Sequence, residues 1–234
     1  KHLLSAVADV KKMAHKLLEI KAKRQAIKRT PYEVPAFEYR KFANEFPYMI
    51  TDDQGKAIKN IIDDMKGDIA MDRLVVGDVG YGKTEVAMRA AMIAAFNKRQ
   101  CCILAPTTLL AEQHFESFVD RFDGMNLNIK LLTRESKSEA KKVLQGMKSG
   151  DVDIVIGTHR LIQKDITFSN LGLMVVDEEH RFGVKQKEDI NKQRGVVDIL
   201  SLSATPIPRT LSLTMHGIRD ISTIRTAPQK RLAV

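Results

Sequence analysis

After residue 51, short β-rich runs alternate regularly with longer helical patterns, and this alternation limits the chain to few folds. The periodicity predicts helices over 52–66, 84–98, 108–121, 136–148 and 206–216. It predicts strands over 73–76, 102–105, 129–132, 153–157, 173–176 and 198–203. Such alternation is typical of βαβ units, because parallel strands need a crossover that is usually a helix. We therefore expect an α/β fold in which helices cover both faces of a parallel β-sheet.

The size and composition of the chain fit one globular core with an appendage. The 234 residues are 44% hydrophobic and 29% charged. No apolar run approaches the roughly 18 residues that would cross a bilayer, so no membrane segment is expected. The chain starts at Lys1 without a signal peptide, and we expect it to be a piece of a longer protein. The adjacent Cys101 and Cys102 are expected to be buried in a strand, which suits a reducing, cytoplasmic compartment.

The positive charge of the chain is concentrated at its N-terminus. The net charge is +9, and residues 1–29 hold nine Lys and Arg against two acidic residues, so this segment carries +7 and the rest only +2. The remaining 205 residues are therefore not a strongly basic nucleic-acid grip. Any DNA strand that this part of the chain binds must be held by individually placed groups.

An apolar stripe predicts a helix in the basic N-terminal arm. The stripe consists of Leu3, Val7, Val10, Ala14 and Leu17. Lys21 and Arg24 interrupt it, and Pro31 followed by Pro35 is expected to end the helix. We favour a helix that lies on the domain, or leads in from an upstream domain, over direct DNA binding. An aromatic-rich connector follows over 36–50.

The sequence GDVGYGKT is a phosphate-binding loop in the required context, after a predicted strand and before a predicted helix. It comprises Gly77, Asp78, Val79, Gly80, Tyr81, Gly82, Lys83 and Thr84. The glycines allow the backbone N–H groups to curl around phosphate oxygens at the N-terminus of a helix. Lys83 is predicted to contact the β- and γ-phosphates, and the Thr84 hydroxyl to bind Mg²⁺. The expected ligands are ATP and Mg²⁺.

A pair of carboxylates follows the apolar run LMVV, in the sequence DEEH. Asp177 at the end of this strand suits Mg²⁺, which prefers oxygen ligands. Glu178 is the expected base for the attacking water. The alternative is that DEEH is only a polar cap on a buried strand, but the phosphate-binding loop favours the catalytic interpretation.

Gln54 has two possible roles. Thr51 and Gln54 form the T-x-x-Q pattern of a capping box at the start of a predicted helix. The same glutamine could instead read the edge of an adenine base. The residues alone do not decide between these roles.

The combination of DEEH, RFGV and LSATPIPRT resembles the first motor domain of superfamily 2 helicase-like translocases. Together with PTTLLAEQH, IGTHRL and TEVAMRAA, it is most similar to bacterial transcription-repair coupling factors, while TEVAMRAA separates it from branched-DNA helicases of the RecG type. The resemblance covers essentially the whole chain and implies a RecA-like domain. It implies an arm over 1–35, the connector over 36–50, the ATP-binding domain over 51–226 and a linker over 227–234.

The resemblance also implies roles for individual residues. Phe46 and Gln54 match an adenine-recognition motif, with the aromatic ring stacked on the base. Thr107, Thr108, Thr158 and His159 match motifs that contact the phosphate backbone of DNA without reading its sequence. His180, Ser203, Ala204 and Thr205 match the motif that couples the nucleotide pocket to DNA.

The same resemblance implies a larger machine. The parent is expected to move on double-stranded DNA, displace a stalled RNA polymerase and recruit a nucleotide excision repair protein. Its second motor domain, expected in cis, would supply an arginine finger, so this chain alone is expected to hydrolyse ATP weakly. The alternatives are a RecG-like branched-DNA helicase and an interaction module that does not hydrolyse ATP.

Overall fold

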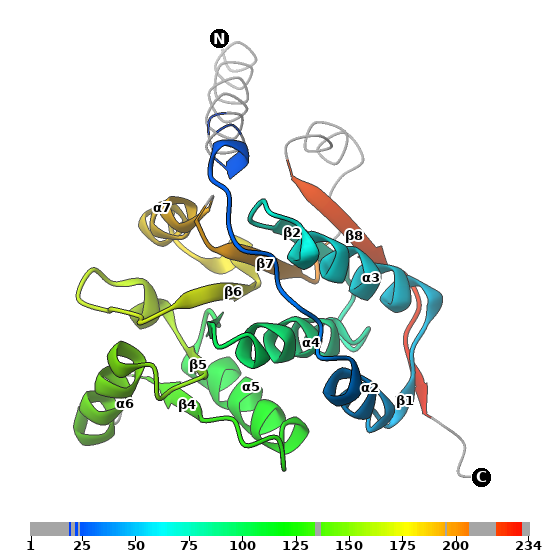
Figure 1. The fold of residues 1–234 in the computed structure, drawn as a ribbon, viewed down its shortest axis with the longest axis horizontal. Helices are drawn as coiled ribbons and strands as arrows, with labels where there is room; N and C mark the ends of the chain where they lie inside the picture. The colour runs from blue at the N-terminus through cyan, green and yellow to red at the C-terminus, as the bar shows by residue number, and fades with distance from the viewer. Residues whose placement is uncertain are drawn as a thin grey trace.

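The computed structural model describes residues 19, 22, 24–133, 137–194, 196–205 and 219–230 of the chain (Figure 1). The predicted stripe over residues 3–17, the predicted helix over 206–216 and the last four residues lie outside these ranges. Within the described residues, no helix is both long enough and apolar enough to cross a membrane.

A parallel sheet of seven strands forms the centre of the fold, with the order β4-β5-β3-β6-β7-β2-β8. Its strands are β2 (Asp72–Gly77), β3 (Gln100–Leu104), β4 (Ile129–Leu132), β5 (Ile154–Gly157), β6 (Leu171–Asp177), β7 (Asp198–Ser203) and β8 (Asp220–Ile224). All six strand pairs are parallel. The predicted parallel sheet is therefore confirmed, and its carboxyl ends meet at one edge.

Helices cover both faces of this sheet. They are α3 (Asp52–Lys66), α4 (Lys83–Phe96), α5 (Thr108–Arg121), α6 (Lys137–Ser149) and α7 (Val184–Gln193), with the short helices η1 (His159–Ile162) and η2 (Glu179–Arg181). On one face, Ile103 and Val175 share a core with residues of α3, α4 and α5. On the other face, Leu104 and Val176 pack with residues of α6 and α7. The two cores follow from the alternation of side chains along each strand.

The two cysteines show this alternation directly. Cys101 and Cys102 are adjacent in β3, are fully buried and belong to the cores on opposite faces. Burial raises the pKa of both thiols. The expectation of buried residues within a strand is confirmed.

The aromatic connector contains a helix that its sequence pattern did not indicate, α2 (Ala36–Asn44). Phe42 in this helix is fully buried, and its ring centroid lies 4.9 Å from that of Phe122 after α5. Strand β1 (Tyr48–Met49) then pairs antiparallel with β9 (Gln229–Lys230). The connector is thus joined to the C-terminal end of the described chain.

The helix of the N-terminal arm ends earlier than predicted. Helical backbone ends at Ala26, five residues before Pro31, so the expectation that Pro31 ends the helix is wrong. The reason is a competing backbone interaction, because Lys28 forms an antiparallel bridge with Ile69. Tyr32 is then buried between the guanidinium groups of Arg29 and Arg99, at 4.7 Å and 4.4 Å from the ring centroid. These contacts dock residues 28–32 onto the folded domain.

Candidate active site

A cleft of about 1150 Å³ opens at the carboxyl edge of the sheet, where the loops after β2 and β6 meet. Its walls include Gly80, Lys83 and Thr84 from the first loop and Asp177 and Glu178 from the second. The strand β7 lies between β2 and β6, so the two loops approach each other across one intervening strand. The predicted phosphate-binding loop and the predicted carboxylate pair therefore line one cleft.

The loop between β2 and α4 needs glycine at two positions. Gly80 and Gly82 have φ angles of 82° and 74°, in the left-handed region that side chains with a Cβ rarely adopt. A Cβ on Gly82 would also lie 2.3 Å from Nε2 of Gln54. Helix α4 begins at Lys83 directly after this turn. The backbone N–H groups of its first turn have no partner within the helix and point toward the cleft.

Lys83 is folded back onto the loop that carries it. Its Nζ donates hydrogen bonds to the carbonyl oxygens of Gly77 at 2.5 Å and Asp78 at 3.0 Å. Burial lowers the pKa of Lys83, and attraction to Glu178 and Asp177 partly opposes this shift. The ammonium group therefore lies in the field of both carboxylates of the second loop.

Asp177 ends β6 with its carboxylate nearly buried. Its Oδ2 lies 2.8 Å from Nε2 of His114, a buried residue of α5. The sequence interpretation missed His114, although a signal existed. With Ala111 and Phe118, His114 follows the i, i+3, i+7 spacing of the buried face of α5, where a histidine needs a polar partner.

Glu178 has a φ of 48°, which is unusual for a residue with a side chain. Its Oε1 accepts a hydrogen bond from the Ala204 N–H at 3.0 Å. Its Oε2 is buried, makes no hydrogen bond, and lies 3.2 Å from Nδ1 of His180. One carboxylate oxygen is thus fixed, while the other lacks a hydrogen-bond donor.

The four residues predicted to couple this cleft to DNA lie together around Glu178. Besides the Ala204 contact, the Ser203 hydroxyl lies 2.9 Å from that of Thr205, and Thr205 Oγ1 lies 3.4 Å from Nδ1 of His180. The loop after β7 is therefore connected by side chains to the loop after β6.

Gln54 performs the capping role and a second role. Its Oε1 accepts from the Thr51 N–H at 2.9 Å, and Thr51 Oγ1 accepts from the Gln54 N–H at 3.3 Å, which completes the capping box. Its Nε2 donates to the carbonyl oxygen of Tyr81 at 2.9 Å. The fully buried glutamine thus ties the start of α3 to the phosphate-binding loop.

Phe46 lines the cleft beside Arg121, a residue that the sequence interpretation did not identify. The Arg121 guanidinium lies 5.8 Å from the Phe46 ring centroid and 3.7 Å from that of Phe42. It also donates to both carboxylate oxygens of Glu85, each at 3.0 Å, and to the Phe42 carbonyl at 2.6 Å. Arg121 therefore holds the aromatic connector against α4 and α5.

The predicted DNA-contacting residues lie after two neighbouring strands. Thr107 caps α5 after β3, and Thr108 is its first helical residue. Thr158 is buried after β5, and His159 begins η1. Since β3 pairs with β5 up to Leu104 and Gly157, these two loops share the carboxyl edge with the cleft.

The donors in the cleft fit a nucleotide phosphate with a bound Mg²⁺. The left-handed turn at Gly80 and Gly82 opens the loop toward the cleft, and Thr84 and Asp177 add oxygen ligands. Among the described residues, no group of three or more His, Cys, Asp or Glu could hold a metal unaided. The oxygen atoms of Thr84 and Asp177 suit Mg²⁺, which is commonly bound by one or two carboxylates together with phosphate oxygens of a substrate.

The comparisons with known proteins agree with this geometry. The family model described as DEAD/DEAH box helicase matches residues 51–214. The transcription-repair-coupling factor of Haemophilus influenzae is 50% identical over 98% of this chain, and that of Escherichia coli is 49% identical over 98%. The chain spans about 20% of the length of each of these relatives.

A structure of RecG bound to a three-way DNA junction is similar to the fold, with a TM-score of 0.79. It is 34% identical, and the match covers 96% of this chain and 31% of the RecG chain. The helicase domain of Pyrococcus furiosus Hef, at 24% identity and a TM-score of 0.56 over 74% of this chain and 38% of the Hef chain, is similar in fold.

Proposed function

The chain belongs to the DEAD/DEAH box helicase family, and from this premise we propose that it is the first of two ATP-binding motor domains of a DNA translocase. The observation that carries the proposal is that Lys83, Asp177 and Glu178 line the same cleft. This cleft lies at the edge of the sheet where the predicted DNA-contacting loops also begin. We propose that residues 51–226 form this motor domain, that 1–35 and 36–50 are an arm and a connector, and that 227–234 lead toward the second domain.

The nucleotide is held by groups from both loops. The backbone N–H groups around Gly80 and Gly82 bind phosphate oxygens, and Lys83 exchanges its carbonyl contacts for the β- and γ-phosphates. Thr84 and Asp177 would hold Mg²⁺, and Phe46, which lines the cleft, would contact the adenine. Gln54 would reach the adenine only by exchanging its contacts with Thr51 and Tyr81, because its side chain is fully buried. When bound, Mg·ATP supplies the phosphoryl group that is transferred to water.

Glu178 accepts the proton of the attacking water. Its Oε1 accepts from the Ala204 N–H, whereas its Oε2 has no hydrogen-bond donor but is buried, so Oε2 would take the proton once the loop moves and admits the water. The same contact connects the base to the loop after β7, so movement of Ser203, Ala204 and Thr205 changes the position of Glu178. Thr107, Thr108, Thr158 and His159 lie in the segments that follow β3 and β5. DNA that these residues hold would act on the cleft through the two segments.

The relatives suggest the activity of the longer protein. We propose that it moves on double-stranded DNA, releases a stalled RNA polymerase and brings in nucleotide excision repair, because the matching relatives bear the name transcription-repair-coupling factor. The described chain outside the basic arm carries little net charge, which suits phosphate contacts that are independent of DNA sequence.

Whether the site needs a second domain for catalysis is tested by measuring ATP hydrolysis by the 234-residue chain alone. Phosphate release is measured with Mg·ATP, with and without duplex DNA. An arginine supplied in trans contributes about 10³ to 10⁵ in rate in related phosphoryl-transfer sites, so the chain alone should show near-background turnover that DNA does not stimulate. Robust hydrolysis stimulated by DNA would contradict a site completed by a second domain.

The catalytic role is tested by Glu178→Gln in a longer protein that carries both motor domains. Nucleotide binding should persist while hydrolysis and polymerase release are lost. Unchanged hydrolysis would favour an interaction module that does not use this cleft for catalysis.

A RecG-like activity is the second candidate, because the RecG structure resembles this chain over 96% of its length. Unwinding of a branched DNA substrate by the longer protein, without release of a stalled polymerase, would favour it.

A further inference from the structure

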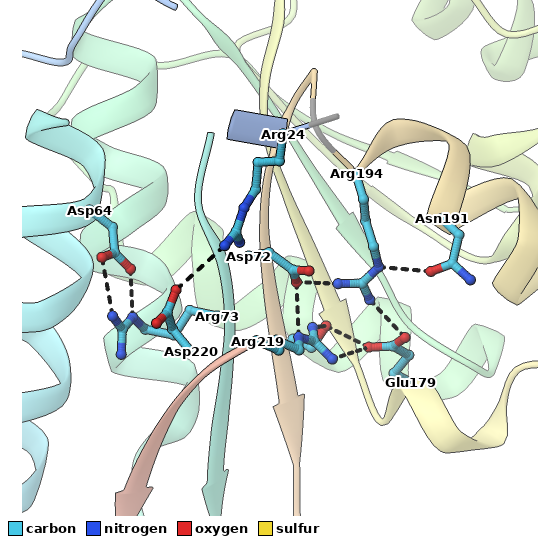
Figure 2. Close-up of polar contacts among 10 residues, drawn as sticks. Arg24, Asp64, Asp72, Arg73, Glu179, Asn191, Arg194, Arg219 and Asp220 are labelled. Carbon is cyan, nitrogen blue, oxygen red and sulfur yellow. Dashed lines mark hydrogen bonds and ion pairs between the residues drawn. The ribbon is translucent and has the colours of Figure 1, made fainter. Parts of the chain in front are cut away.

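A buried ionic network joins η2, the short helix after the proposed base Glu178, to neighbouring elements (Figure 2). Glu179, the residue after Glu178, is its acidic member nearest to the cleft. Its Oε1 pairs with Nη2 of Arg194 at 2.8 Å, and its Oε2 pairs with Nη1 of Arg219 at 3.1 Å. The Ser201 hydroxyl also donates to Oε2 at 2.7 Å. Glu179 is therefore fixed by three donors and is not available to substrate.

The network reaches the start of the strand that precedes the phosphate-binding loop. Asp72, the first residue of β2, pairs with Arg194 and lies 2.9 Å from Nε of Arg219. Two arginines and two carboxylates thus balance in charge, and all but Glu179 have side chains no more than 8% exposed. Asp72 and Glu179 lie in β2 and η2, Arg194 directly follows α7, and Arg219 directly precedes β8.

Fold stability alone does not explain such a network. Burying charges removes their hydration, and apolar residues of similar volume are often as stable or more so. What an ion network fixes is the orientation of the groups that it joins. Here the group next to it is Glu178, whose left-handed backbone is unfavourable for a residue with a side chain and persists only where its surroundings enforce it.

We propose that Glu179 is a positioning residue that holds Glu178 in its left-handed conformation, through ion pairs to Arg194 and Arg219. Backbone contacts complete the turn, because the Glu178 N–H donates to the Leu202 carbonyl at 2.9 Å and the Glu178 carbonyl accepts from the Arg181 N–H at 2.8 Å. Glu179 thereby determines where the Glu178 carboxylate points. This inference rests on the proposed role of Glu178 as the base.

The opposite face of β2 offers a matched control. Arg73 follows Asp72 and points to the other face, where it makes two contacts with the Asp64 carboxylate, at 2.6 Å and 3.1 Å, and donates to the Ser222 hydroxyl at 3.0 Å (Figure 2). The Asp64 side chain is 24% exposed and that of Glu179 is 22% exposed. Each cluster therefore contains an arginine, a carboxylate and a serine. Only the Glu179 cluster adjoins the cleft, because Glu179 directly follows Glu178.

The test compares Glu179→Gln with Asp64→Asn in the longer protein, using kcat and KM for ATP hydrolysis and the Kd of a fluorescent ATP analogue. Misplacement of a reacting group by about 1 Å can cost about 10²-fold in rate, so Glu179→Gln should lower kcat about 10- to 100-fold. The Kd should change less than about threefold, because the phosphate-binding loop is untouched. Asp64→Asn should leave kcat within about twofold. Equal kcat values for the two variants would overturn the proposal, as would a loss of kcat matched by an equal loss of binding.

A second measurement does not depend on activity. Hydrogen–deuterium exchange of the segment 177–183 in the 234-residue chain should become faster in Glu179→Gln and stay unchanged in Asp64→Asn. Ser201→Ala, which removes two hydrogen bonds of the network, to Glu179 and from Arg219, but no charge, serves if Glu179→Gln does not fold, and should accelerate exchange in the same segment. Unchanged exchange would overturn the positioning role even if Glu178→Gln had shown the proposed function to be wrong.

Discussion

His114 Nε2 lies 2.8 Å from Oδ2 of Asp177, so a histidine in the middle of α5 holds the carboxylate that ends β6. The same helix begins at Thr108, a residue proposed to contact DNA. Helix α5 therefore carries both a residue proposed to contact DNA and the histidine that holds the carboxylate proposed to bind Mg²⁺. A movement of α5 when DNA binds would shift this carboxylate.

This contact predicts the effect of His114→Ala on metal dependence. Loss of a residue that orients a metal-binding carboxylate typically costs 10- to 100-fold in metal affinity or activity. We expect the Mg²⁺ concentration for half-maximal hydrolysis by the longer protein to rise about tenfold. Glu116→Ala, on the exposed side of the same helix, is the control and should leave the titration unchanged. An identical titration for His114→Ala would show that the contact is only structural.

Gln54 makes two side-chain contacts, so replacing it should affect both protein stability and ATP binding, whereas loss of the helix cap alone should affect only stability. Gln54→Ala leaves the Thr51 N–H and the Tyr81 carbonyl without their partner, which should lower the free energy of unfolding by about 1–3 kcal/mol. It should also weaken ATP binding, because Tyr81 belongs to the phosphate-binding loop. Thr51→Ala breaks the cap but not the Tyr81 contact, and should destabilise by about 0.5–2 kcal/mol without weakening ATP binding.

The ratio of ATP to GTP affinity then separates the two interpretations of Gln54. A ratio that falls in Gln54→Ala supports a reading of the adenine edge. Equal weakening of both nucleotides would leave Gln54 as a support for the loop.

Arg121 is predicted to support Phe46, the residue that we propose contacts the adenine. Arg121→Met removes the guanidinium that joins Phe42, Phe46 and Glu85, while Glu85 keeps its ion pair with Arg89 at 2.9 Å. We expect binding of the ATP analogue to weaken about tenfold, equivalent to about 1.4 kcal/mol. Arg99→Met is the control, because Arg99 also stacks on an aromatic ring but lies away from the cleft. Equal affinities for the two variants would exclude this role of Arg121.

The buried Asp198 predicts a specific pH dependence of stability. Burial, outweighing attraction to Arg29, raises its pKa to about 6 from an ordinary value of 3.8. The folded state therefore binds a proton that the unfolded state has released between about pH 4 and pH 6. Stability from this group is present below pH 4 and is lost as the pH rises through about 6. The charged or titratable groups around it are Arg29, Tyr32 and Arg99.

Denaturant unfolding from pH 4 to pH 7 tests this sign. The free energy of unfolding of the wild type, minus that of Asp198→Asn, should fall across this range by about 2–3 kcal/mol, because each tenfold difference in proton affinity between the folded and unfolded states corresponds to about 1.4 kcal/mol. The subtraction removes the contribution of the other titrating groups. A difference that stays constant with pH would mean that Asp198 is ionised in the folded protein throughout this range.

Local patterns in the sequence predicted most of the secondary structure. Helices α3 and α5 and strands β4 and β7 have the predicted bounds, because hydrophobic periodicity and capping depend on residues close together in the chain. The left-handed turn at Gly80 and Gly82 was predictable for the same reason. Helix α7 was not predicted, because its sequence VKQKEDINKQ is mostly polar and only Ile190 is buried.

The fold class, the phosphate-binding loop and the carboxylates of the second loop could thus be predicted from sequence, since each is encoded in a short contiguous segment. The strand order and the contacts of His114, Arg121 and Glu179 became known only from the three-dimensional structure. Each of these side chains acts on a partner far away in the sequence, on another strand, helix or loop. Such pairs form because the sheet brings the ends of β2, β6 and β7 to one edge, and no local pattern records which side chains will meet there.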